Sequence, residues 1–205
     1  MKFHLIYDGE LPPESRASAD LKHRIRQQLH PQLRALWYGS GSLKYLTMAD
    51  RNGKAEVDLI ANEYERHGVR FVPLVRLANR MGCRLEILLL LREEPHIFSG
   101  AGAGDLDNRV KTLMDGLRMP THQKSDLGTA ALVSPQPDEN PLFCLVEDDR
   151  SIYQISVSTD RLLAPPRPDQ KHRDVIAIVK AHITNANGTE FAYLSANLGL
   201  ETGKH

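Results

Sequence analysis

No stretch of this 205-residue sequence is apolar over the roughly 18 residues that a membrane-spanning helix needs. The longest apolar run, residues 85–91, has the length of a strand and contains Glu86. The first residues, MKFHLIYDG, also lack the apolar stretch and the small-residue cleavage site of a secretory signal peptide. We therefore expect a protein without a membrane span that stays in the cytoplasm.

Cysteine is scarce, since the chain contains only Cys83 and Cys144. Both stand in apolar, strand-like surroundings, which favours two free buried thiols over a disulfide in a reducing compartment. No CxxC or HxxxH pair is present, so the sequence does not support a zinc site.

The sequence has no excess charge of either sign, because 26 lysines and arginines balance 26 aspartates and glutamates. This balance argues against a protein that coats nucleic acid through general basicity. The neutrality arises by cancellation, however, since residues 66–84 contain several arginines and no acid, while acids gather elsewhere. This pattern is compatible with a protein that binds a polyanion around a metal site. Taken alone, the arginine-rich stretch is also explained by the solvated face of a helix.

The spacing of apolar residues predicts helices and strands along the chain. Helices are expected over residues 14–29, 55–67, 72–81 and 104–117. Strands are expected over residues 2–7, 83–91, 142–146, 151–158 and 175–179. Pro31 is expected to interrupt the first helix, and Gly68 to cap the second. The continuous apolar run at 83–91 predicts a central strand covered on both faces.

Strands interleaved with helices indicate a mixed α/β or α+β fold, with a mixed sheet flanked by helices. The length favours a single domain over residues 1–184. A turn is expected at 38–42, a flexible stretch at 99–104 and a linker at 164–170, and the Pro- and Gly-rich composition of 119–141 predicts a long loop. Residues 185–205 show little periodicity and are expected to form a tail.

The helix expected at 104–117 carries two stripes of side chains. The apolar stripe, expected to face the core, consists of Val110, Leu113, Met114 and Leu117. The second stripe lies about a quarter turn away and consists of Asp107, Lys111 and Asp115. If the chain is extended at Asp105 and Asp107, both point the same way, and Asp107 stands at the helix start, where backbone N–H groups favour a carboxylate.

A second acidic group follows the expected strand at 142–146, where Glu147, Asp148 and Asp149 stand in succession. Carboxylates held together cost free energy unless a cation pairs with them. Each feature has a simple explanation alone: an N-cap at Asp107, a surface ion pair between Lys111 and Asp115, and a solvated strand end. Taken together, the oxygen donors indicate a site for a hard cation, and we expect that cation to be Mg²⁺.

Other chemistries fit the same residues less well. The segment DLDN is similar to a D-x-D phosphatase motif, but the first aspartate of that motif should follow directly on a buried strand, and a glycine-rich stretch intervenes here. The segment GAGAG lacks the G-x-G-x-x-G spacing of a dinucleotide site, and no Gly-Lys-Ser/Thr follows it, which excludes a P-loop.

The segment DLDNRVKTLMDGL, residues 105–117, followed by EDDRSI, residues 147–152, resembles the signature of the RusA-type Holliday junction resolvases. That signature is D-x-D-N, a lysine four residues after the second aspartate, D-[AG]-L on the same helix, and then D-D-x-x-[IV] at the start of a strand. Every element is present in order. Members of the family usually reach the D-x-D sooner, and the connection between residues 117 and 147 is longer here than is usual.

The resemblance implies a small α/β endonuclease fold, a homodimer, and cleavage of branched DNA such as a four-way junction with Mg²⁺, or Mn²⁺ in its place. The catalytic residues that it implies are Asp105, Asp107, Lys111 and Asp149. The metal ligands that it implies are Asp105, Asp107 and Asp149, with Asp148 beside them. Contacts with the DNA backbone are expected from Arg76, Arg80, Arg109 and Lys111. A non-catalytic DNA-binding protein of the same fold and a metal-dependent phosphatase are the alternatives.

Overall fold

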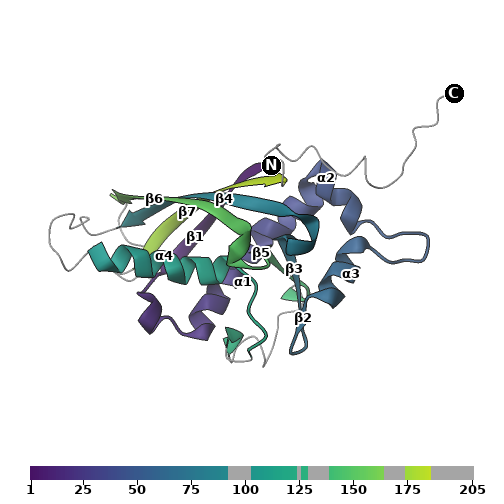
Figure 1. Ribbon diagram of the computed structural model, residues 1–205, viewed down its shortest axis with the longest axis horizontal. Helices are drawn as coiled ribbons and strands as arrows, with labels where there is room; N and C mark the ends of the chain where they lie inside the picture. Colours follow the sequence, from purple (N-terminus) through teal and green to yellow (C-terminus); the bar gives the residue numbers. More distant parts are fainter. Residues whose placement is uncertain (92–102, 124–125, 129–138, 164–173, 186–205) are drawn as a thin grey trace.

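The computed structural model describes residues 1–91, 103–123, 126–128, 139–163 and 174–185, which form a mixed α+β fold with two sheets (Figure 1). The strands are β1 (Lys2–Glu10), β2 (Glu65–Arg66), β3 (Val69–Val75), β4 (Met81–Leu91), β5 (Leu142–Val146), β6 (Ile152–Arg161) and β7 (Asp174–Asn185). The α-helices are α1 (Ala19–Gly39), α2 (Gly41–Lys44), α3 (Glu56–Glu63) and α4 (Ala103–Leu117). Short 3₁₀ helices are η1 (Glu14–Arg16), η2 (Tyr45–Thr47), η3 (Leu77–Asn79) and η6 (Asp149–Ser151).

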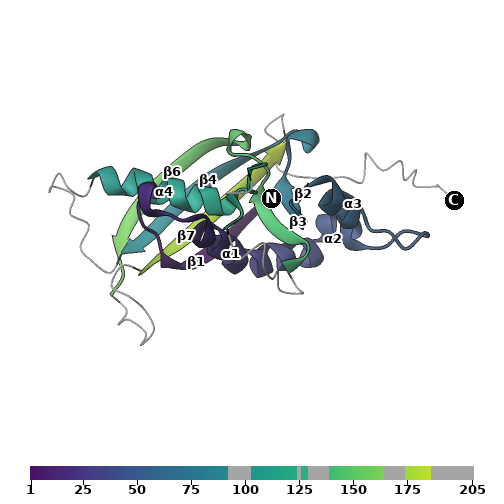
Figure 2. The same cartoon turned by 90° about the horizontal axis from the view of Figure 1, so that it is seen from below.

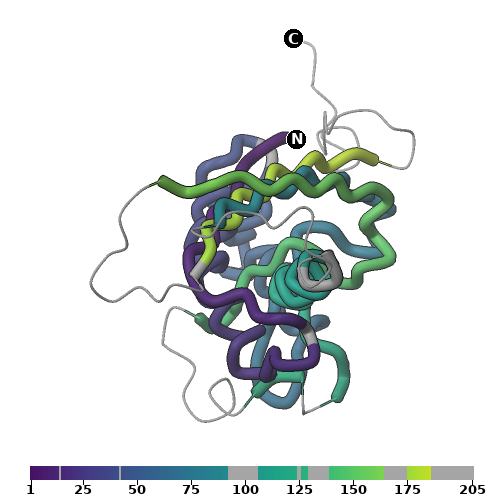
Figure 3. The backbone as a smooth tube through the Cα atoms, turned by 90° about the vertical axis from the view of Figure 1, so that its left-hand side faces the viewer, coloured from purple at the N-terminus to yellow at the C-terminus, as the bar shows by residue number. Residues whose placement is uncertain are grey.

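The larger sheet has the strand order β1-β7-β4-β6, in which β4 pairs antiparallel with β7 and parallel with β6. Helices α1 and α4 lie on one side of this sheet, below it in Figures 1 and 3 and toward the viewer in Figure 2. Side chains of β4 alternate, so that Leu85 and Leu89 are buried on the helix side while Arg84 and Glu86 are partly exposed. The expected central strand is confirmed, but the expectation that both of its faces are covered is wrong.

The smaller sheet has the order β2-β3-β5, and its parallel strands β3 and β5 are buried almost throughout. Phe143 of β5 packs against the rings of His30 and Trp37 of α1, and its backbone N–H donates to His30 Nδ1 at 2.9 Å. Parallel pairing of two strands that are covered on both faces accounts for their continuous apolar sequence. Helix α1 therefore links the two sheets.

Helix α1 runs through Pro31 without a break, so the predicted interruption is wrong. Ser18 caps the start of the helix, where its side chain accepts from the backbone N–H of Leu21 at 3.2 Å. Proline within a helix costs about 3 kcal/mol, but Leu33 and Trp37 beyond it are buried in the core. Burial of these side chains offsets that cost. The turn predicted at 38–42 is confined to Ser40, whose extended backbone ends α1 and separates it from α2.

The helix predicted over 55–67 ends at Glu63, and the chain then turns back through His67 and Gly68, both at positive φ, as the β2–β3 hairpin. Gly68 therefore serves a turn and not a helix cap. The helix predicted over 72–81 is wrong, because these residues complete β3, form η3 and begin β4. The β-branched residues Val72 and Val75 suit a buried strand, and pairing with β5 decides between the two structures.

Helix α4 confirms the predicted helix and its apolar stripe. Leu113 and Leu117 are buried, and Val110 and Met114 are partly buried against the same core. The helix begins at Ala103, however, so Asp105 and Asp107 lie within it and not in an extended segment before it. On the side of α4 that packs against α1, Gly116 touches Ile25 so closely that any Cβ at position 116 would clash with the Ile25 side chain.

Cys83 and Cys144 are free and buried, as predicted, and burial raises the pKa of each thiol to about 12. No helix of the described residues is long and apolar enough to cross a membrane. The predicted linker at 164–170, the tail after Asn185, and parts of the segments predicted at 99–104 and 119–141 lie outside the described residues.

His23 of α1 is buried, and neither ring nitrogen has a hydrogen-bond partner among the described residues. Burial, together with the charge of Arg26, lowers its pKa from 6.5 to about 4. The unfolded chain therefore binds a proton more readily than the folded chain. The stability that a neutral His23 contributes is complete above pH 6.5 and is lost as the pH falls toward 4.

We expect the wild-type protein to lose about 2–3 kcal/mol of its free energy of unfolding between pH 6.5 and 4 through this one group. The variant His23→Leu should show a correspondingly flatter profile in urea denaturation over this range. The exposed His4 provides the control, because His4→Gln should keep the wild-type slope. Parallel profiles for wild type and His23→Leu would contradict the assignment.

Candidate active site

Asp107 and Lys111 form an exposed ion pair on α4. Lys111 Nζ lies 2.9 Å from Asp107 Oδ2, and the side chains are 52% and 71% exposed for lysine and aspartate respectively. An acid four residues before a lysine is the favourable order for a helix pair. Asp105 lies in the first turns of the same helix, and its side chain is outside the described part of the chain. The N-terminal half of α4 thus presents an acid and a cation to solvent.

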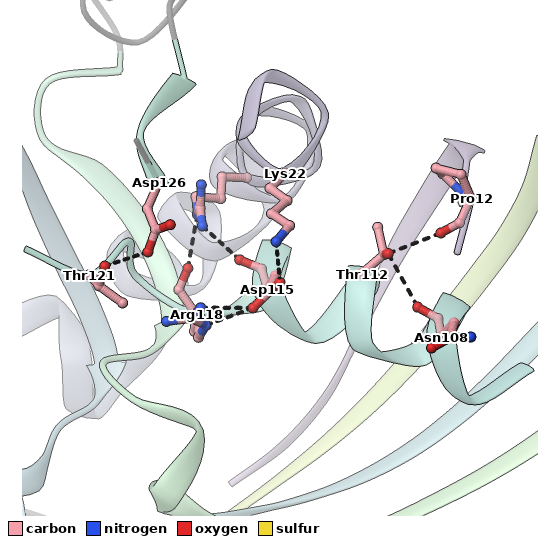
Figure 4. A network of polar contacts seen from close by, with 9 residues as sticks. Pro12, Lys22, Asn108, Thr112, Asp115, Arg118, Thr121 and Asp126 are labelled. Carbon is pink, nitrogen blue, oxygen red and sulfur yellow. Dashed lines mark hydrogen bonds and ion pairs between the residues drawn. The ribbon is translucent and has the colours of Figure 1, made fainter. Parts of the chain in front are cut away.

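Asp115 has a different environment from Asp107, although both belong to the same predicted stripe. It forms ion pairs with Lys22 of α1 and with Arg118, whose Nε donates to Asp115 Oδ1 at 2.9 Å (Figure 4). Burial acts to raise the pKa of Asp115, but the hydrogen bonds from Lys22 and Arg118 outweigh burial and lower it. Asp115 therefore holds α4 to α1 and does not face the exposed part of the stripe.

Glu147 is held at the carboxyl ends of β3 and β5. Its backbone N–H donates to the carbonyl of Val75 at 2.9 Å, and its Oε2 accepts from Tyr64 Oη at 3.0 Å and from the backbone N–H of Leu77 at 2.8 Å. Burial and the neighbouring Glu147 carboxylate raise the pKa of Tyr64 to about 12. Sequence reasoning missed Tyr64 and Leu77, because Tyr64 fits the apolar stripe of the predicted helix and a backbone donor leaves no sequence signal.

Asp148 and Asp149 follow directly in the turn before β6. Asp148 caps η6, accepting from the backbone N–H of Arg150 at 2.9 Å and from Arg150 Nε at 3.0 Å, and these contacts hold the pKa of Asp148 well below its usual range. Asp149 is exposed on the 3₁₀ turn itself. Because the chain enters η6 at Asp149, the three acids do not continue β5 as an extended strand. We call Glu147–Asp149 the acidic turn.

The acidic turn lies at the C-terminal end of α4. Met119, two residues beyond the helix, donates its backbone N–H to the carbonyl of Val146 at 2.9 Å, directly before Glu147. Asp107 precedes this contact by twelve residues, so it lies about 15–18 Å away along the helix axis. Figures 1 and 2 show the same arrangement, with the start of α4 and the start of β6 at opposite ends of the helix.

The basic residues predicted to contact DNA divide in the same way. Arg76 and Arg80 flank η3, whose Leu77 binds Glu147, so both lie beside the acidic turn. Arg80 adopts a left-handed backbone conformation with φ of 50° between η3 and β4. Arg109 lies on the N-terminal half of α4, two residues after Asp107 in the sequence. The structure therefore has two groups, each with acidic and basic side chains, at the two ends of α4.

Within the described ranges, no three histidine, cysteine, aspartate or glutamate side chains lie close enough together to hold a metal ion. Asp107 and Asp148 are each paired with a cation of the chain, and Glu147 is paired with Tyr64. The donor atoms are those that a hard cation prefers, but the described residues of a single copy do not fit one metal ion.

Comparisons with known proteins identify no relative of this chain. No family model matches the chain, and neither the curated proteins nor the solved structures contain a match.

Proposed function

We propose that this chain is a Mg²⁺-dependent endodeoxyribonuclease that cleaves branched DNA in the cytoplasm as a homodimer, with Mn²⁺ as an alternative ion. The observation that carries the proposal is the exposed pair of Asp107 and Lys111 on α4. These residues are the second aspartate of the D-x-D-N segment and the lysine four residues after it. A carboxylate and an ammonium group left in solvent on a helix otherwise packed into the core contribute little to the fold. Their exposure leaves them accessible to a phosphodiester.

In this proposal the metal ligands are the carboxylates of Asp105 and Asp107 and those of Asp149 and Asp148 beside it, two groups that lie too far apart in one copy to share an ion. Lys111 acts as a point charge beside the phosphate that is cleaved, where it offsets the negative charge that develops in the transition state. The contacts with flanking backbone phosphates come from the arginines Arg76, Arg80 and Arg109.

The test is incubation of the purified protein with labelled four-way junction, flap and linear duplex, in Mg²⁺, in Mn²⁺ and in EDTA. We expect cleavage of a branched substrate with either metal ion and none in EDTA. Full cleavage in EDTA would overturn the metal dependence, and equal cleavage of linear duplex would overturn the preference for branched DNA.

A second candidate is a protein that binds branched DNA without cutting it. The distance between Asp107 and the acidic turn within one copy favours this alternative, because it leaves each acidic group without the other. Tight binding of the junction with no cleavage under any metal condition would establish it in place of the nuclease.

The variant Lys111→Ala should lose cleavage by about ten- to a hundred-fold while its affinity for the junction stays within a few-fold, because the interaction is made mainly in the transition state. Stability should change by less than about 0.5 kcal/mol, since the pair with Asp107 is exposed. The measurements are single-turnover rate, junction affinity and melting temperature. The exposed Lys54 supplies the control, because Lys54→Ala should cut normally. If Lys111→Ala cleaves at the wild-type rate, Lys111 has no role in cleavage and is only a charge on the helix surface.

A further inference from the structure

Tyr153 lies on the face of the larger sheet that points away from α1 and α4, which we call the outer face (above the sheet in Figures 1 and 3). The register of β6 against β4 shifts between Cys83 and Arg84, and this shift leaves Tyr153 as an extra residue of β6. Such a bulge redirects a side chain, and here the ring lies over Gly82 of β4. Tyr153 is nevertheless 59% exposed.

Gly82 leaves the room that the ring of Tyr153 occupies. A Cβ at position 82 would lie 2.9 Å from Cδ1 of Tyr153 and 3.1 Å from Cε1, so a larger side chain there would displace the ring. The Tyr153 hydroxyl lies 3.5 Å from Oγ1 of Thr184 on β7, where either oxygen can donate. The ring is thus held across β4 and β7, and its remaining surface faces solvent. An aromatic ring in this position offers a surface on which a nucleobase can stack.

Basic side chains surround Tyr153 on the outer face. The strand register aligns Lys2 of β1, His182 of β7 and Arg84 of β4 in one row, and Lys180 and Glu86 stand in the next. Lys180 Nζ and Arg84 Nη2 each lie 3.0 Å from a carboxylate oxygen of Glu86. Three lysine and arginine side chains therefore stand against one carboxylate, which leaves this end of the outer face positively charged.

The other end of the outer face carries acids. Asp8 of β1 lies about 20 Å along its strand from Lys2, and Asp160 lies near the end of β6. An anionic chain is therefore attracted to the end that holds Tyr153 and repelled from the other. The same end adjoins the acidic turn, because Tyr153 follows Asp149 by four residues.

We propose that this end of the outer face binds single-stranded DNA, with a base stacked on Tyr153 and backbone phosphates beside Arg84 and Lys180. An exposed aromatic ring within a basic surface is typical of sites for single strands. Bases within a duplex stack on each other and leave no face for Tyr153, so the ring selects an unpaired segment. The choice of DNA rests on the proposed nuclease function. It narrows the substrate of that function to a flap or an opened branch point, whose unpaired strand passes from Tyr153 to the acidic turn.

Binding is tested apart from cleavage, by fluorescence anisotropy of a labelled thymine oligonucleotide in EDTA. The wild-type protein should bind it. Tyr153→Ala should weaken this affinity about ten-fold and change the affinity for linear duplex by less than about two-fold. Tyr153→Phe keeps the ring and should bind the oligonucleotide as the wild type does. The matched control is Tyr45→Ala, which removes a tyrosine that is 71% exposed on η2 and should leave the affinity unchanged.

The phosphate contacts are tested by the salt dependence of the same binding. Lys180→Gln should reduce the slope of log affinity against log salt concentration by about 0.7, the value for one lost phosphate contact with a single strand. The control Arg161→Gln removes a cation at the acidic end of the same sheet and should keep the wild-type slope.

The variant Tyr153→Trp provides a readout that a purely structural role of Tyr153 would not move. The chain has one tryptophan, Trp37, and it is buried, so new exposed emission reports on position 153. The oligonucleotide should quench this emission because a base stacks on the ring, and linear duplex should not. In the control Tyr45→Trp, neither DNA should quench the new emission.

These measurements separate the stacking site from the nuclease function. The stacking site would be overturned by a wild-type protein that binds no single strand, by wild-type affinity in Tyr153→Ala, or by an equal loss of affinity for single strand and duplex, whether or not the protein cleaves DNA. A loss confined to the single strand, in a protein that cleaves nothing with Mg²⁺ or Mn²⁺, would uphold the stacking site and remove the nuclease function. In a protein that cleaves, equal rates for wild type and Tyr153→Ala on a limiting concentration of flap would overturn the role of Tyr153 in substrate choice.

Discussion

The variant Asp107→Asn is expected to lose cleavage of branched DNA by at least about a hundred-fold, which corresponds to roughly 3 kcal/mol of transition-state free energy. Asparagine keeps the size of the side chain but removes the negative charge that a divalent cation requires. The same change lowers the repulsion between the protein and DNA phosphates, so junction affinity in the absence of metal should be unchanged or higher.

The fold should tolerate this change. Asp107 lies within α4 and not at its cap, its side chain is 71% exposed, and its pair with Lys111 is a surface pair. The melting temperature should therefore stay within a degree or two of the wild-type value. The control is Asp58→Asn, the same substitution at an exposed position of α3, which should cleave normally. Near-normal cleavage by Asp107→Asn, or a loss that follows unfolding, would remove Asp107 from the site.

Sequence periodicity was sufficient wherever the apolar residues of an element follow one simple spacing. The strands that begin at Lys2, Leu142 and Ile152 and the stripe on α4 were all predictable from local spacing. The errors concern segments whose structure is decided by partners distant in sequence. Residues 72–81 have a spacing that also fits a helix, and only the parallel pairing of β3 with β5 makes the first of them a strand. Pro31 stays helical because Leu33 and Trp37 bury themselves beyond it.

The candidate site shows the same limit. Its residue types were readable from the sequence, because carboxylates next to apolar segments are conspicuous. Their relative positions were not readable, since the separation of Asp107 from the acidic turn depends on where α4 begins and on the contact of Met119 with Val146. The roles of the three acids in the turn also differ for reasons outside the local sequence. Tyr64 orients Glu147, and Arg150 pairs with Asp148, while Asp149 is exposed.

Arg26→Met should destabilise the protein by about 3 kcal/mol. Arg26 is 2% exposed on α1, and its guanidinium donates to the backbone carbonyls of Arg118 at 2.9 Å and Asp115 at 2.7 Å. Carbonyls at a helix C-terminus have no partner within the helix, so Arg26 satisfies the end of α4 from a neighbouring helix. Burial lowers the pKa of Arg26 to about 10, which still leaves it charged at neutral pH.

Methionine at position 26 would fill much of the same volume but would remove the guanidinium that donates to both carbonyls. Urea denaturation monitored by circular dichroism should show a lower midpoint with an unchanged slope. Arg24 is exposed on the same helix, so Arg24→Met should stay within about 0.5 kcal/mol of the wild type. Equal midpoints for the two variants would contradict the role of Arg26.

Arg26→Met and Asp107→Asn should also differ in how they affect cleavage. Arg26 touches the end of α4 that leads into the contact with the acidic turn, and it lies far along the helix from Asp107. Its loss should therefore lower cleavage in proportion to the unfolded fraction, and conditions that restore folding, such as a lower temperature, should restore the rate. Asp107→Asn should remain inactive when fully folded. A rate for Arg26→Met that stays low in the fully folded protein would show that the end of α4 positions the site as well as stabilising the fold.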